Sequence, residues 1–333
     1  MTIERAPSPR IRHWIRTAAV AATVISMAAT GAGAQTPGTF PPAGTPSGTP
    51  PGGLPGGPSA GIGGAEAATL GPPPLPPLTE AQKVLADLPP PMKAGLLPQP
   101  PVPADAPRPS ADPRDFQGIW FHNQPLETRL QKDMYGWEPP VTMAAAKVIA
   151  RRVTSQAAGK PFVNASAKCL PPGPQWQRDL NFPFLIVQGK TSVQFIFEEY
   201  HGRWNITLDP KASPLPAGKE YMGRSVGHWE GDTLVVESTD FKQALWLDVD
   251  GTPLSPEGKL LQRIRKVDLG NGRPFLEVIT TIIDPKYYTD PWNIVRTFGW
   301  QPNAAFFKEY NCEEQVGDAS AITDSGLVNE PGD

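Results

Sequence analysis

Residues 223–238, GRSVGHWEGDTLVVES, have the pattern of a β-hairpin. Two segments rich in apolar and β-branched residues, 223–229 and 233–238, flank the tripeptide EGD. Gly231 supplies the positive φ that a tight turn needs. The stretch therefore predicts two neighbouring antiparallel strands joined by a short turn.

Similar short β-rich segments lie on both sides of this hairpin. With it they make about eight candidate strands by pattern, the others being 184–187, 192–200, 203–208, 258–267, 275–283 and 304–310. The long helical pattern is at 142–153. Strands without alternating helices favour antiparallel pairing, so we predict a mainly β, antiparallel fold with one or two short helices.

The β-rich part opens with DFQGIW at 115–120. A Gly-x-Trp motif on a first strand is similar to the opening of lipocalin-like barrels, where the Trp closes the barrel floor and the Gly allows a close chain approach. The motif favours a closed or nearly closed lipocalin-like β-barrel. A two-sheet sandwich is the alternative.

The first 34 residues have the features of an export signal. Arg10, Arg12 and Arg16 precede an apolar run that ends in AGA at 32–34, a small-x-small cleavage site. The run is shorter than the roughly 20 apolar residues of a bilayer span. We predict cleavage before Gln35, no membrane span in the mature chain, and a periplasmic or secreted location.

Residues 35–113 are dominated by Pro, Gly, Ala, Ser and Thr, which predicts a disordered linker. One helical island interrupts it: Thr79 and Gln82 make a capping-box pattern, and Pro89 ends the turn. This helix either docks on the domain or stays independent. Residues 114–333 are predicted to form a single β-rich domain, long enough for a full hydrophobic core.

Cys169 and Cys312 are the two cysteines of the chain. Export delivers them to an oxidising space, and neither has a neighbouring His in the sequence. We therefore predict that they form a disulfide bond. A catalytic thiol is the alternative.

His228 and Glu230 are the first candidate acid–base pair. In the functional interpretation, His228 at a strand end titrates near neutrality beside a carboxylate, as a general acid or base must. In the structural interpretation, Glu230 and Asp232 are solvated charges at a hairpin tip.

The segment FEEYH at 197–201 gives the second candidate. On a strand, Glu199 would continue the face of Phe195 and Phe197, and burial would raise its pKa toward that of a useful base. His201 follows as a further candidate catalytic residue. The alternative is that the strand emerges into solvent at Glu198.

The proline-bracketed segment DPKYYTDPW at 284–292 is predicted to be a rigid turn that presents large rings. Rings with polar tips suit a pocket that admits a flat or oily molecule, although they can equally close one end of the barrel as core. The candidate ligand-binding residues are Tyr287, Tyr288, Trp292, Trp229, Phe195 and Phe197.

The remaining patterns argue against other classes of site. Outside the signal, His122, His201 and His228 have none of the close spacings of zinc motifs, so no metal is predicted. No Gly-rich phosphate loop follows a strand, and no organic cofactor is predicted. A net charge of −3 without basic blocks argues against nucleic-acid binding.

Four motifs together, CLPPGPQW, VGHWEGDTLVVEST, DPKYYTDPW and KEYNC, resemble a large, mostly uncharacterised family of secreted bacterial proteins. The resemblance covers about residues 115–314 and implies export. The chain departs from the family pattern at Gln262-Arg263, where many relatives carry Glu-Arg, so a role tied to that acid is not expected here.

Compartment and fold lead to three functional hypotheses. The first is a periplasmic enzyme without organic cofactor, of lyase or isomerase type, that moves a proton on a hydrophobic, aromatic small molecule. The second is a non-catalytic carrier or sensor of such molecules. The third is an envelope interaction module on a Pro-rich spacer.

Overall fold

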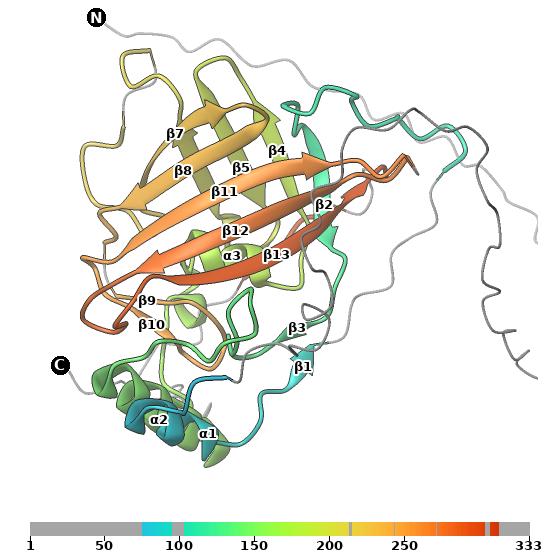
Figure 1. The fold of residues 1–333 in the computed structure, drawn as a ribbon. Coiled ribbons are helices and arrows are strands. Elements are labelled where there is room, and N and C mark those ends of the chain that lie inside the picture. Colours follow the sequence, from blue (N-terminus) through green and yellow to red (C-terminus); the bar gives the residue numbers. More distant parts are fainter. Residues whose placement is uncertain are drawn as a thin grey trace, which may run out of the picture. The chain divides into compact units, whose positions relative to one another are not determined.

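The main β-strands close into a nine-stranded barrel in the computed structural model of the protein (Figure 1). The structure describes residues 75–94, 103–212, 215–242, 244–270, 272–303 and 307–312. Around the barrel the strand order is β11-β12-β13-β2-β4-β5-β6-β7-β8. Their bounds are β2 Gly118–His122, β4 Phe184–Gln188, β5 Ser192–Phe197, β6 Arg203–Thr207, β7 Arg224–Glu230, β8 Thr233–Thr239, β11 Lys259–Val267, β12 Phe275–Ile283 and β13 Trp292–Gln301.

The barrel is mixed, which corrects the expectation of purely antiparallel pairing. Strands β6 and β7 are parallel, with Ile206 opposite Ser225 and Thr207 opposite Val226. All other neighbours in the barrel are antiparallel. A parallel pair needs a long crossover, and residues 208–223 connect β6 to β7. The predicted barrel itself is confirmed.

The hairpin of β7 and β8 is confirmed. Glu230 pairs with Thr233, and Gly231 in the turn has φ +56°. The last strand is different from the one expected at 304–310. Residues 304–306 lie outside the described residues, 307–310 are not a strand, and β13 closes the barrel by pairing with β12 and β2.

The Gly-x-Trp motif at the start of the barrel has a clear packing role. Gly118 has φ +126°, and a Cβ atom there would lie 2.9 Å from Nε1 of Trp300. Trp120 is buried in the barrel interior and donates its Nε1–H to the carbonyl of Phe116 at 2.8 Å. Aromatic side chains fill the interior around it, among them Phe184, Phe195, Trp204 and Phe298.

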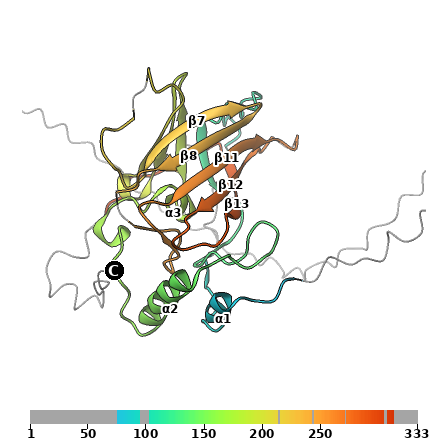
Figure 2. The same cartoon turned by 60° about the vertical axis from the view of Figure 1, so that its left-hand side comes forward.

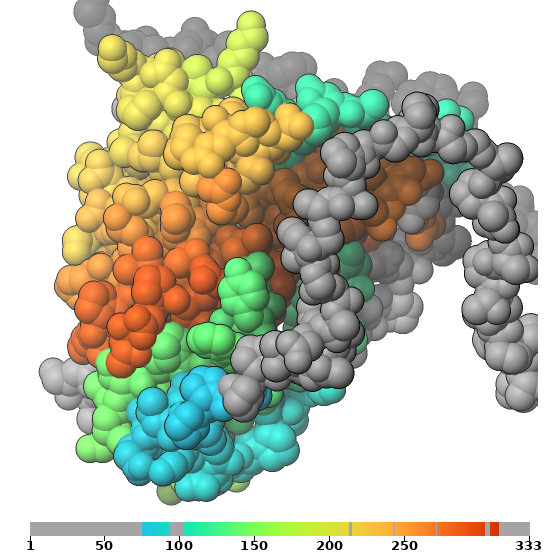
Figure 3. Space-filling model, in the orientation of Figure 1, coloured from blue at the N-terminus to red at the C-terminus, as the bar shows by residue number. Residues whose placement is uncertain are grey.

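Two helices pack beside one end of the barrel, α1 (Glu80–Ala86) and α2 (Met143–Ala157) (Figures 1 and 2). The capping box at the start of α1 is confirmed, with Thr79 accepting from the backbone of Gln82. Ala81 is buried in a core cluster with residues of α2, so the helix docks. In the space-filling view α1, in blue, lies against the green surface that includes α2 (Figure 3).

The expected linker therefore divides into two parts. Residues 35–74, like the predicted signal at 1–34, lie outside the described residues. The part from residue 75 onward contributes α1 and a short strand β1 (Lys93–Ala94), which pairs with β3 (Leu126–Glu127). Lys266 on β11 also donates to the carbonyl groups of Ser110 and Asp115.

A third helix, α3 (Pro174–Asp179), places Arg178 inside the barrel. Arg178 is fully buried, and its guanidinium lies over the ring of Trp204 at 5.3 Å. It donates to Gln175 at 2.8 Å and to Thr280 at 3.3 Å. With the Gln262 amide turned so that its oxygen faces Arg178, Gln262 accepts from both Nη1 and Nη2 at 2.7 and 2.9 Å. The hydrogen-bond partners of this guanidinium are thus neutral side chains, and burial, opposed by the charge of Asp179, lowers its pKa to about 10.

Cys169 and Cys312 are bonded, as predicted. The disulfide ties the 3-10 turn η1 (Ser166–Lys168), which precedes α3, to the C-terminal segment 307–312. Among the described residues, no helix has the length and apolar character required to cross a membrane.

Candidate active site

The two acid–base candidates lie toward opposite ends of the barrel. Glu199 belongs to the 3-10 turn η2 (Glu199–His201), which directly precedes β6. His228 is near the end of β7, and β7 runs parallel to β6 with Ser225 opposite Ile206. Because the start of β6 and the end of β7 are at opposite ends of parallel strands, the two candidates belong to different sites.

His228 and Glu230 lie on the solvent-facing side of β7. His228 Nε2 is 3.2 Å from Glu230 Oε1, and Arg263 Nη2 donates to Glu230 Oε2 at 2.9 Å. The side chains of His228 and Glu230 are 64% and 48% exposed. The hydrogen bond from Arg263, followed by that with His228, lowers the pKa of Glu230. This is the geometry of solvated hairpin-tip charges, and neither residue lines a cavity described below.

Glu199 is held in an unusual turn because β5 ends at Phe197 rather than at Tyr200. Tyr200 and His201 have φ values of +56° and +50°. Non-glycine residues rarely adopt this left-handed region, and such strain is concentrated at functional sites. The turn takes Glu199 out of the alternating strand pattern and leaves the His201 side chain in solvent.

Helix α3 holds this turn in place through a side-chain hydrogen bond. Gln177 Nε2 donates to the backbone carbonyl of Glu199 at 2.9 Å. The next residue after the turn, Gly202, leaves room for this contact, because a Cβ atom there would lie 2.7 Å from Gln177 Oε1. The residue that positions Glu199 thus directly follows the motif CLPPGPQW in the sequence.

The Glu199 carboxyl is buried beside two tyrosines. Its side chain accepts a hydrogen bond from Tyr310, at 3.3 Å to Oε1, and also interacts with the adjacent Tyr200. Its Oε2 makes no hydrogen bond to any residue that the structure describes. Burial, reinforced by the charge of the adjacent Glu198, raises the pKa of Glu199 to about 7, and the tyrosine hydrogen bonds oppose the shift. The carboxyl can therefore gain or lose a proton near neutral pH.

This pKa predicts a defined pH dependence of stability. The folded-state pKa of Glu199, about 7, is above its ordinary value of 4.5. Between these two pH values the native protein therefore holds more protons than the unfolded chain. Stability from this group is fully present below pH 4.5 and is lost as the pH rises through 7. The free energy of unfolding of the wild type should fall by on the order of 3 kcal/mol between these pH values, and this fall should be absent in Glu199→Gln. Urea unfolding at pH 5 and pH 8 measures it.

Glu230→Gln is the control for that measurement. Its carboxyl is exposed, and its lowered pKa keeps it ionised over the whole interval. The variant should keep the pH dependence of the wild type. An unchanged pH dependence in Glu199→Gln would contradict the assignment of a buried, protonated carboxyl.

Tyr200 connects Glu199 to a cleft. Two cavities, of about 220 and 230 Å³, share the lining residues Arg152, Asn164, Trp176 and Trp246. We call them together the tryptophan cleft. Tyr200 and Ser166 line one of its two lobes, and Lys168, Tyr221 and Leu245 line the other. Glu199, next to Tyr200 in the sequence, thus lies beside the wall of the cleft.

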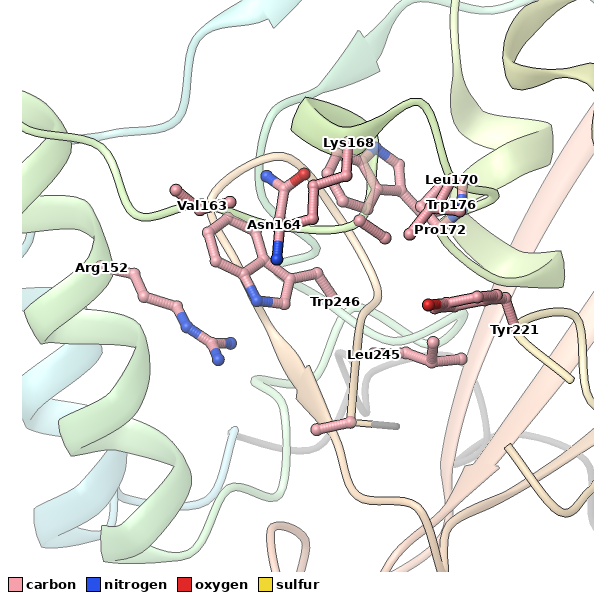
Figure 4. A pocket seen from close by; sticks show the side chains of 12 residues that line it. Arg152, Val163, Asn164, Lys168, Leu170, Pro172, Trp176, Tyr221, Leu245 and Trp246 are labelled. Carbon is pink, nitrogen blue, oxygen red and sulfur yellow. The ribbon is translucent and has the colours of Figure 1, made fainter. Parts of the chain in front are cut away.

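Two indole rings form part of the walls of the tryptophan cleft. Trp176 and Trp246 are stacked, with ring centroids 6.1 Å apart and an interplanar angle of 13°. Arg152 lies 4.5 Å over the ring of Trp246 and donates to the carbonyl of Gly251. Figure 4 shows Arg152 entering from α2 on one side of Trp246, with Tyr221 on the other side of the lobe.

Local sequence features place each wall of the cleft. Trp176 lies on α3, which begins at Pro174 after Gly173, and a Cβ atom at Gly173 would be 2.6 Å from Leu245. Trp246 lies on the short strand β9 (Leu245–Trp246), which pairs with β10 (Pro253–Leu254). Asn164 lies in the loop between α2 and η1 and accepts a hydrogen bond from the backbone N–H of Ser166 at 2.9 Å.

The predicted ligand-binding residues lie elsewhere. Phe195 and Phe197 pack in the barrel interior, and Tyr287, Tyr288 and Trp292 are buried in the core cluster beneath α2. Trp229 contacts Phe116 at 5.3 Å and the guanidinium of Arg114 at 5.7 Å. None of these residues lines the tryptophan cleft.

Sequence reasoning missed several residues of this site: Tyr200, Tyr310, Gln177, Trp176 and Arg152. Trp176 and Tyr310 belong to two of the quoted motifs, and each of these motifs also contains one of the two cysteines. The predicted disulfide could therefore have indicated that these two residues lie near each other. Among the described residues, no group of three or more His, Cys, Asp or Glu side chains is placed to hold a metal ion.

Comparison of the chain with protein-family models, with curated proteins and with solved structures gave no match. The resemblance of its motifs to a secreted family therefore stays a prediction.

Proposed function

We propose that the protein is an exported enzyme without organic cofactor that transfers a proton, in a lyase or isomerase reaction, on a hydrophobic, aromatic small molecule. One observation carries the proposal. The buried Glu199 carboxyl interacts with the adjacent Tyr200, and Tyr200 forms part of a cleft walled by the stacked Trp176 and Trp246.

In the proposed mechanism, the aromatic part of the substrate lies against the tryptophan walls. Tyr200 accepts a proton from the substrate while its own hydroxyl proton passes to the ionised Glu199. Burial and the Glu199 charge raise the pKa of Tyr200, so the hydroxyl does not ionise alone and the two transfers occur together. Return of the proton at another substrate atom gives an isomer, and departure of a leaving group gives elimination.

Two features support an exported enzyme of this kind. The disulfide between Cys169 and Cys312 needs an oxidising compartment, in agreement with the predicted signal. The same disulfide joins η1 to the segment that carries Tyr310. The crosslink thus holds in place two sides of the Glu199 environment.

The test starts with a substrate search. The exported protein is incubated with a panel of aromatic alcohols, ethers and olefins, and mass spectrometry and thermal shift are recorded together. On a substrate found in this way, Glu199→Gln and Tyr200→Phe should each lower turnover by roughly 100-fold, as loss of a positioned acid–base group does. His228→Gln, on the exposed hairpin, should keep wild-type turnover.

The pH profile gives a second readout of the same site. Because Glu199 acts in its ionised form, turnover should rise with pH through about 7 and then level off. The rise should be absent in Glu199→Gln. Loss of turnover in His228→Gln with full activity of Glu199→Gln would move the catalytic site to the hairpin.

A carrier of aromatic molecules is the second candidate, and the stacked tryptophan walls favour it equally. A carrier would show a thermal shift with members of the panel but no change in their mass. Tyr200→Phe would then change affinity alone.

A further inference from the structure

The charged residues in the wall of the tryptophan cleft all have the same sign. Arg152 lines both lobes, and Lys168 lines the lobe that also contains Tyr221. Among the described residues, no Asp or Glu lines either lobe. The wall is therefore positively charged in a chain whose net charge is −3. A concave surface lined by one sign of charge attracts ligands of the opposite sign.

Lys168 is the charged group of this wall that is free to contact a ligand. It is exposed, and its ammonium group makes no hydrogen bond or ion pair with any other described residue. Arg152, in contrast, is buried and already donates to the carbonyl of Gly251. Arg152 therefore adds positive charge to the wall, whereas the Lys168 ammonium can donate hydrogen bonds to an anion.

The backbone around Lys168 is held in place. Lys168 is the last residue of η1, and its backbone N–H donates to the carbonyl of Ala165 at 3.0 Å. The next residue, Cys169, is bonded to Cys312. The crosslink thus keeps the lysine at the cleft, where Figure 4 shows it on a different side of the lobe from Tyr221.

The remaining wall of the Lys168 lobe suits a small apolar body. The volume of this lobe is about 220 Å³, and Leu170, Pro172 and Leu245 belong to its lining. The Tyr221 ring adds a further apolar surface, with Lys242 Nζ 5.0 Å from its centroid. Apolar side chains beside an exposed ammonium group match a ligand with an apolar body and one anionic group.

The two lobes differ in how well they accept an anion. The other lobe contains Tyr200, which is adjacent to the buried Glu199 carboxyl, and no lysine of the described chain lines it. An anion there would lie near the ionised Glu199, and like charges at short distance repel each other. The anionic group is therefore favoured in the Lys168 lobe, with the rest of the ligand extending toward Tyr200.

We propose that the tryptophan cleft binds an aromatic monocarboxylate, whose carboxylate accepts a hydrogen bond from Lys168 Nζ and whose other end faces Tyr200. A single negative charge matches the single lysine of the cleft wall. The inference rests on the proposed function where it calls the ligand aromatic and a substrate. The carboxylate site itself follows from the charge of the cleft.

Isothermal titration of the full chain with three naphthalene probes tests the charge preference. 2-Naphthoate is anionic, 2-naphthamide has nearly the same shape without the charge, and protonated 2-(aminomethyl)naphthalene is cationic. The wild type should bind the naphthoate about fivefold more tightly than the amide, the value of one exposed ion pair, and the cationic probe most weakly. Because Lys168 is exposed, the preference should decrease in about 1 M NaCl.

Three variants locate the effect. Lys168→Gln should bind the naphthoate and the amide equally, with wild-type affinity for the amide. Lys190→Gln is the matched control, because Lys190 is exposed and lines neither lobe, and it should keep the fivefold preference. Ala244→Trp, at an exposed position in the Lys168 lobe, should weaken both probes by filling the lobe.

Kinetics give an independent readout of the same contact. On an aromatic acid that the protein turns over, Lys168→Gln should raise KM about fivefold and leave kcat unchanged, because the lysine binds the carboxylate without taking part in the proton transfer.

Equal affinity of the wild type for the naphthoate and the amide would overturn the proposal. So would failure to bind the naphthoate, or a preference that survives in Lys168→Gln. A charge preference without turnover of any aromatic acid supports the carboxylate site and contradicts the enzyme. Turnover of neutral aromatic molecules without a charge preference overturns the carboxylate site and leaves the proposed function in place.

Discussion

Replacing Cys169 by serine is expected to lower the free energy of unfolding by roughly 5 kcal/mol, and replacing Cys312 should have the same effect. The two cysteines are 143 residues apart, so their bond closes a loop that includes most of the barrel. A crosslink over so long a loop strongly restricts the unfolded chain. Either substitution removes the same restriction.

Urea unfolding of the two single variants and of the double variant Cys169→Ser/Cys312→Ser measures this effect. All three should be destabilised equally, because one bond is lost in each. Wild-type protein unfolded in the presence of a reductant should approach the same value. A single variant as stable as the wild type would contradict this explanation, and so would a double variant much less stable than either single variant.

Replacing Arg178 by methionine is expected to lower the free energy of unfolding by about 3 kcal/mol. The methionine keeps an apolar side chain beside Trp204. It removes the guanidinium group, which donates two hydrogen bonds to Gln262. Gln175 and Thr280 each lose one hydrogen bond to a charged group as well. The penalty for leaving these buried polar groups without a donor exceeds the gain from removing a buried charge.

Gln262→Glu is the counterpart of that experiment. A carboxylate in this position would face Nη1 and Nη2 of Arg178, at the distances of a two-point ion pair. The variant should be more stable than the wild type at neutral pH. Because pairing depresses the folded-state pKa of the new carboxyl, this gain should disappear as the pH falls through that pKa. If Gln262→Glu is less stable than the wild type at pH 7, the charge of Arg178 is compensated by a group other than residue 262.

Local signals in the sequence predicted the elements that short-range chemistry determines. The capping box of Thr79 and Gln82 identified α1, and the turn glycine of the EGD tripeptide identified the hairpin of β7 and β8. The parallel pairing of β6 and β7 has no such signal, because it depends on where a long connection returns the chain. The last strand was misplaced because β13 directly follows Pro291, at the end of a segment interpreted as a turn.

The candidate site shows a similar division. The alternation of Phe195, Phe197 and Glu199 correctly singled out a carboxylate next to the core, although the structure buries it by a different turn. Its partners come from distant segments, since Gln177 lies on α3 and Tyr310 near the C-terminal cysteine. A single sequence contains no record of such long-range contacts. The tryptophan cleft was missed for the same reason.

The order of strands around the barrel also constrains when the domain can fold. Strand β2, the first of the barrel in sequence, pairs only with β4 and β13 among the described strands, and β13 is the last. Phe298 opposite His122 is one of the contacts that seal this seam. Loop-closure entropy must be overcome before such distant strands meet, which makes the seam a slow step. A chain emerging from its N-terminus therefore remains an open sheet, with two unpaired edges, until nearly all of its residues have been released.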